Sequence, residues 1–148
     1  ELIPQNSGRL IGLGMDIIEA ANRTLKVHHP ERPEVTTVDV VEFYDEDPVS
    51  GRCRGVVILG ESHMDRSPCG TGTTAKMTLL HRRGQFGFDE TFTNTSPLGT
   101  TFQGRLVEDI QLGDTRAVVA EVRGSAQITG IHEFIIDPKD PFQEGFLI

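Results

Sequence analysis

Residues 65–75 read DRSPCGTGTTA, a sequence that places a cysteine at a glycine-rich turn where a helix is expected to begin. Pro68 and the glycine-rich turn around Cys69 are typical of the start of a helix. Peptide dipoles and free N–H groups at a helix N-terminus favour a thiolate over a thiol. Cys69 is therefore the first candidate for a reactive residue.

The residues next to this motif predict a strand before it and a helix after it. Residues 56–59 are four apolar residues between Gly55 and Gly60, which predicts a buried strand leading to the motif. Apolar residues continue to Leu80, and Gly84 follows two arginines, as expected where a helix ends. The pattern predicts a largely buried helix that starts at Cys69.

The rest of the chain alternates between helix and strand patterns. An amphipathic helix is expected over residues 10–21, with Asn6 and Ser7 able to cap it. Strands are expected over residues 35–44, 91–95, 101–111, 117–122 and 126–136. These elements predict an α+β domain in which a mainly antiparallel sheet packs on a helix.

Composition favours a single domain over residues 1–148. The chain has 36% hydrophobic residues, enough for a core, and no run near the roughly 18 apolar residues of a membrane span. Its formal net charge of −8 and the absence of a basic stripe argue against nucleic acid and anionic membranes as partners. With no signal-peptide pattern at its first residues, a cytoplasmic location is the default expectation.

Several short motifs carry a family resemblance. They are residues 65–75 (DRSPCGTGTTA), Lys76-Met77, Leu79-Leu80, residues 124–126 (GSA), residues 128–130 (ITG), His132, Asp137-Pro138, residues 140–142 (DPF) and Gly145-Phe146. In these motifs the chain resembles the proline racemase and hydroxyproline 2-epimerase family, which works without pyridoxal phosphate. The resemblance implies no cofactor. It also implies one lobe of a diaminopimelate-epimerase-like fold, in which the sheet wraps a central helix starting at Cys69.

The helix start also suggests how a substrate would be held. Exposed N–H groups of Gly70, Thr71 and Gly72 would form an anion site suited to an amino-acid carboxylate. The resemblance implies that the N–H groups of Gly70 and Thr71 hold that carboxylate. Asp65 has two compatible roles: it caps the turn through backbone N–H bonds, or, as the resemblance implies, it binds the ring nitrogen of proline.

Two further residues concern the choice of substrate. Leu59 occupies a place where proline racemases carry a phenylalanine, and its smaller side chain favours 4-hydroxyproline over proline. His63 lies two residues before Asp65 and either faces the pocket or is an ordinary surface histidine. Cys69 itself favours epimerisation, because the related trans-3-hydroxyproline dehydratases usually have threonine at this position.

Other interpretations of the motifs are weaker. A Walker loop needs Ser or Thr after Gly-Lys, whereas Ala75-Lys76-Met77 stands at that place. No His, Cys and carboxylate grouping has zinc spacing. Cys53 is expected to be an ordinary thiol, and with two cysteines and no sign of secretion a structural disulfide is not expected. His132 is expected in a strand, making a structural hydrogen bond.

The implied mechanism needs two bases, of which this chain supplies one. The other, a cysteine or serine before Gly-His-Gly in the family, is absent from these residues. The chain is therefore expected to be the C-terminal lobe of a two-lobed enzyme for an imino acid, completed by an N-terminal lobe. The alternatives are a non-catalytic binding lobe, and a homodimer that presents two copies of Cys69 across a shared cleft.

Overall fold

The computed structural model describes residues 1–46, 53–60 and 63–147. Its helices are a 3-10 turn (Pro4–Asn6), α1 (Ser7–Thr24) and α2 (Gly70–Arg82). Its strands are β1 (Val40–Glu46), β2 (Cys53–Leu59), β3 (His63–Met64), β4 (Phe92–Thr95), β5 (Thr101–Leu112) and β6 (Thr115–Arg123). Neither α-helix of the described residues is long and apolar enough to cross a membrane.

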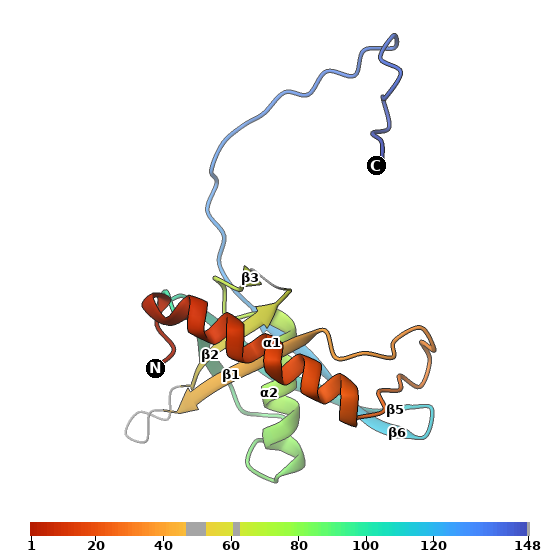
Figure 1. Cartoon of the computed structure of the whole chain (residues 1–148). Helices are drawn as coiled ribbons and strands as arrows, with labels where there is room; N and C mark the ends of the chain where they lie inside the picture. The colour runs from red at the N-terminus through yellow and green to blue at the C-terminus, as the bar shows by residue number, and fades with distance from the viewer. Residues whose placement is uncertain (47–52, 61–62, 148) are drawn as a thin grey trace.

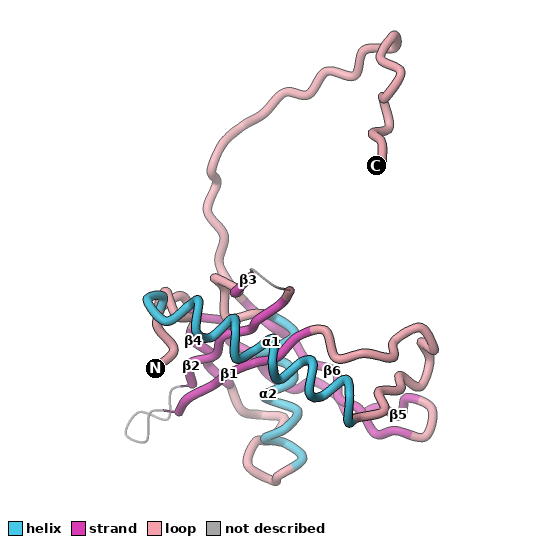
Figure 2. The backbone as a smooth tube through the Cα atoms, viewed as in Figure 1, coloured by secondary structure: helices cyan, strands magenta, loops and turns pink. Residues whose placement is uncertain are grey.

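The strands form one mainly antiparallel sheet in the order β1-β2-β4-β5-β6, with β3 paired to β2 (Figure 2). The pairs β1–β2, β2–β3, β4–β5 and β5–β6 are antiparallel. The β2–β4 pair is parallel and short, joining Cys53 to Asn94 and Arg54 to Thr95. The expected α+β class with a mainly antiparallel sheet is confirmed.

Strand β2 is buried on both faces because a helix covers each of them. Ile58 packs with Leu10 in a cluster under α1, and a Cβ on Gly14 of α1 would lie 2.9 Å from the Ile58 side chain. On the other face, a Cβ on Gly72 of α2 would lie 2.8 Å from Val57. Figure 1 shows α1 in front of β1 and β2, with α2 behind them. The wholly apolar run at residues 56–59 is therefore explained by two covering helices.

Helix α2 packs on β5 and β6 as well as on β2. Met77 is fully buried in a cluster with Leu106 and Phe86. The helix ends where expected, since Gly84 has φ +69°, a backbone conformation that glycine adopts readily. Four of its thirteen residues are buried, so the helix is buried on one face rather than largely buried as expected.

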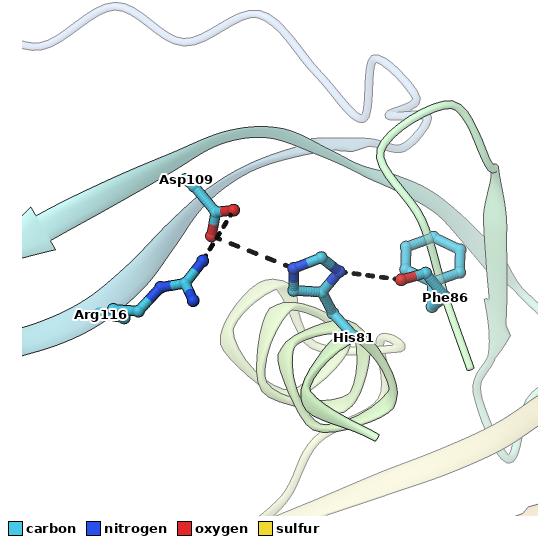
Figure 3. A network of polar contacts seen from close by, with 4 residues as sticks. All are labelled: His81, Phe86, Asp109 and Arg116. Atoms are coloured by element: carbon cyan, nitrogen blue, oxygen red, sulfur yellow. Dashed lines mark hydrogen bonds and ion pairs between the residues drawn. The ribbon is translucent and has the colours of Figure 1, made fainter. Parts of the chain in front are cut away.

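A polar contact fixes the C-terminal end of α2 (Figure 3). The Nδ1–H of His81 donates to the carbonyl of Phe86 at 2.9 Å, and its Nε2 lies 4.0 Å from the Asp109 carboxylate on β5. Arg116 of β6 donates to the same carboxylate at 3.3 Å. The end of α2 distant from Cys69 is thus held against the β5–β6 hairpin.

Three expectations about local structure were wrong or only partly right. The strand expected over residues 126–136 is absent: residues 124–136 run as extended chain away from the body (Figure 1), and His132 is exposed within it. A strand needs a neighbouring edge to bond its backbone, and this segment has none among the described residues. Strand β1 begins at Val40 rather than at residue 35. Asn6 takes the N-cap position of α1, but its side chain bonds the Glu1 carbonyl instead of a helix N–H.

Candidate functional site

The motif starts beside the C-terminal end of β2. After Gly60, strand β3 returns along β2 and places His63 opposite Leu59. The N–H of Asp65 then donates to the Val57 carbonyl at 2.9 Å. Leu59, His63 and Asp65 are therefore brought together at one end of the sheet.

Two side chains shape the loop between Asp65 and Cys69. Asp65 Oδ1 accepts the N–H of Ser67 at 2.8 Å, and Ser67 Oγ accepts the N–H of Cys69 at 3.0 Å. Asp65 thus has a turn-forming role. Its Oδ2 accepts no hydrogen bond from the described residues, so that oxygen remains available to a cationic group.

Cys69 caps α2 with its sulfur. Sγ accepts the N–H of Gly72 at 3.4 Å and lies 3.2 Å from the hydroxyl of Thr71. The side chain is 9% exposed, whereas the second thiol, Cys53, is 2% exposed at the opposite end of β2. Both cysteines are thiols and they form no disulfide with each other.

The first two N–H groups of α2 point to an anion site. Gly70 and Thr71 are exposed, and within the described part of the chain no hydrogen bond uses either N–H. Free N–H groups at a helix start attract a carboxylate or another anion. They lie next to the sulfur of Cys69, so an acid bound there would have its Cα near a thiol.

Leu59 and His63 are placed close to this end but are not enclosed. Leu59 is 39% exposed and His63 is exposed. A cavity of about 850 Å³ lies elsewhere, between β4 and the second half of α2, and its lining includes Lys76 and Arg83 but none of the motif residues 65–72. No group of three His, Cys, Asp or Glu residues in the described ranges could hold a metal ion.

A buried polar layer lies beneath the helix start, and sequence reasoning missed it. Asn94 and Thr73 are fully buried and bond each other at 3.1 Å, and Asn94 Nδ2 lies 3.5 Å from a carboxylate oxygen of Glu42. Lys76 is 2% exposed, with Nζ 3.2 Å from the centre of the Tyr44 ring. Asn94, Glu42 and Lys76 each lie inside an expected strand or helix, but the sequence does not show that they contact one another.

The environment of the Glu42 carboxyl changes its pKa. Burial raises the pKa of Glu42 above its ordinary 4.5, and this outweighs the opposing effects of the Asn94 hydrogen bond and the Lys76 charge. Gly55 and Gly72 leave room for this carboxyl, since a Cβ on either would lie 2.6 or 3.0 Å from its Oε1. Folding therefore shifts the Glu42 carboxyl toward its protonated form.

Glu42→Gln is expected to change how stability depends on pH. A raised folded-state pKa contributes stability that is complete below the unfolded value of about 4.5 and is lost as pH rises through the folded value. Glutamine does not titrate, so the variant should lack this decrease. Urea unfolding between about pH 4 and 8 measures it. Parallel curves for the two proteins would contradict the assignment to Glu42.

Cys69 is expected to react with iodoacetamide near pH 7 much faster than Cys53. The reason is that Cys69 is more exposed and its sulfur accepts the N–H of Gly72 at the start of α2, both of which favour attack by the thiolate. Peptide mapping after brief labelling measures both rates, and the urea-unfolded chain is the control in which they should converge. Equal labelling in the folded protein would count against an activated thiol.

Comparison with known proteins covers almost the whole chain. A family model described as Proline racemase matches residues 1–147. The proline racemase of Clostridioides difficile is 43% identical over 98% of this chain and 44% of its own length. The 4-hydroxyproline 2-epimerase of Streptosporangium roseum is 38% identical over 95% of this chain and 42% of its own length.

The fold of this chain also matches that of a solved structure. The hydroxyproline epimerase of Agrobacterium vitis, with bound trans-4-hydroxy-L-proline, superposes with a TM-score of 0.82 at 33% identity. It matches 100% of this chain and 42% of that one. The chain therefore spans less than half the length of these relatives. Because the family model matches residues 1–147 and the fold superposes on that of a relative, this chain belongs to the proline racemase family.

Proposed function

We propose that this chain is the C-terminal lobe of a two-lobed racemase or epimerase that inverts Cα of 4-hydroxyproline or proline without a cofactor. The lobe would be of the diaminopimelate-epimerase type, with α2 as its central helix. The observation that carries the proposal is the position of Cys69 at the mouth of α2, beside the free N–H groups of Gly70 and Thr71.

The proposed reaction exchanges one proton for another. The Cys69 thiolate takes the Cα proton, and the electrons of the broken C–H bond spread into the substrate carboxylate. The N–H groups of Gly70 and Thr71 stabilise the negative charge that develops there. A thiol on the opposite face then gives its proton to Cα, which inverts the centre. Asp65 Oδ2 would pair with the ring ammonium of the substrate.

The second base is proposed to lie in an N-terminal lobe. The relatives are more than twice as long as this chain. Residues 126–136 expose apolar side chains, including Ile128 (94%), Ile131 (98%) and Phe134 (88%). Such a set of apolar side chains is typical of a surface that another part of a protein covers. A lobe contacting this segment and facing Cys69 would complete the site.

Leu59 supports a hydroxylated substrate within this proposal. Leu59 lies at the end of β2 and is partly exposed, so its side chain would leave space beside the ring of a bound substrate. The relatives include enzymes named for proline and for 4-hydroxyproline, and a structural neighbour holds trans-4-hydroxy-L-proline. The competing functions are those of a proline racemase proper, of a trans-3-hydroxyproline dehydratase and of a non-catalytic lobe.

The test uses the two-lobed protein and three substrates. We expect the optical rotation of trans-4-hydroxy-L-proline to change fastest, that of L-proline more slowly, and trans-3-hydroxy-L-proline to give no ring imine. A ring imine would identify a dehydratase. Tight binding without any change in rotation would identify a non-catalytic lobe.

A further inference from the structure

We infer that Asn94, on β4, is a positioning residue for Cys69 and acts together with Thr73 of α2. The inference rests on the proposed role of Cys69 as a base. In this inference, hydrogen bonds hold the backbone of Cys69 in an unfavourable conformation. That conformation places the Cys69 sulfur at the start of α2.

The backbone of Cys69 is unusual. It has φ 61° and ψ 124°, and it is the one residue other than glycine with positive φ in the described part of the chain. A residue with a Cβ avoids this region because of steric clashes. Such a conformation persists only where the surrounding structure holds it. The hydrogen bonds around Cys69 should therefore identify what holds it.

The φ and ψ of a residue are set by the two peptide groups that flank it. In the first group, the Pro68 carbonyl accepts Asn94 Nδ2 at 3.2 Å and Thr73 Oγ1 at 3.2 Å. Its N–H, that of Cys69, donates to Ser67 Oγ at 3.0 Å. In the second group, the Cys69 carbonyl accepts the N–H of Thr73 at 3.0 Å. Both peptide groups are thus fixed on either side of Cys69.

The side-chain amide of Asn94 is oriented toward the Pro68 carbonyl, and this orientation leaves its oxygen without a hydrogen-bond partner among the described residues. Its Nδ2 must face Pro68 because a carbonyl oxygen only accepts hydrogen bonds. In that orientation Asn94 Oδ1 is buried and has no partner among the described residues. Buried polar atoms without partners are costly and rare in folded proteins. Asn94 lies on the sheet, 26 residues after Pro68, so it ties the loop before Cys69 to a rigid strand.

Asn94→Ala is expected to release the backbone of Cys69. The structural readout is the NOE between the amide proton and Hα of Cys69 in the 148-residue chain, which is strong at positive φ and weak at the ordinary negative φ. In the two-lobed protein we expect kcat to fall at least about tenfold with KM within about twofold, because displacement of a reacting group by about 1 Å can cost about 100-fold.

Ser96→Ala is the matched control. Ser96 is also fully buried and follows β4 directly, but among the described residues its side chain bonds only within its own turn, to Thr100 and Leu98. This variant should keep both the NOE and kcat. The control shows whether the effect of Asn94→Ala comes from losing its contact with Pro68 or from losing any buried hydrogen bond near β4.

Two variants of Thr73 keep the inference testable if Asn94→Ala does not fold. Thr73→Val removes the hydroxyl and should weaken the NOE and lower kcat, whereas Thr73→Ser keeps the hydroxyl and should retain both. A strong NOE, or an unchanged kcat, in Asn94→Ala or Thr73→Val would overturn the inference. If the wild-type two-lobed protein inverts no substrate, the proposed function fails, and the NOE still decides whether Asn94 and Thr73 hold Cys69.

Discussion

Cys69→Ser is expected to lower the rate of inversion by about 100- to 10,000-fold, the range that a positioned acid or base contributes. A serine hydroxyl is a far weaker acid than a thiol and is a poor base at neutral pH. In D2O the wild-type two-lobed protein should place deuterium at Cα of the inverted product, with trans-4-hydroxyproline as the best substrate. Proton NMR follows the loss of the Cα–H signal.

Cys53→Ser is the control for this experiment. Cys53 is buried at the end of β2 opposite to the motif, so its variant should exchange the Cα hydrogen at the wild-type rate. A Cα–H signal that persists in every substrate, with both lobes present, would refute the enzyme proposal. Exchange at an equal rate in Cys69→Ser would show that another group is the base.

Asp65→Asn is expected to weaken binding of pyrrole-2-carboxylate, a planar mimic of the deprotonated substrate, by about 10- to 150-fold. This corresponds to about 1.5 to 3 kcal/mol for a hydrogen bond to a charged group. Asparagine keeps an oxygen at Oδ1, so the bond from the Ser67 N–H can persist while the charge is lost. Isothermal titration calorimetry of the two-lobed protein measures the affinity.

A second variant separates the charge of Asp65 from the shape of the loop that follows it. Ser67→Ala removes the acceptor for the Cys69 N–H but leaves the Asp65 carboxylate unchanged. We expect this variant to bind the ligand more tightly than Asp65→Asn does. If Asp65→Asn binds with wild-type affinity, Asp65 keeps only its role in shaping the loop.

Local sequence patterns predicted the elements that carry the motif. The apolar run at residues 56–59 became the buried strand β2, because four consecutive apolar side chains require cover on both faces. The proline, cysteine and glycines of the motif placed the start of α2, and Gly84 its end. These features depend on residues close together in the chain, so the sequence alone determined them.

Contacts between residues distant in the sequence determine which strands form and how the backbone of Cys69 is held. Residues 126–136 have a strand pattern, yet whether they form a strand depends on an edge that these described residues do not provide. The partners of Asn94 are Pro68, Thr73 and Glu42, which lie 21 to 52 positions away in the chain. The sequence shows an asparagine in a strand, but only the packing of α2 on the sheet brings its amide to the carbonyl before Cys69. Local sequence therefore placed Cys69, the proposed base, at the start of α2, whereas tertiary hydrogen bonds hold its backbone conformation.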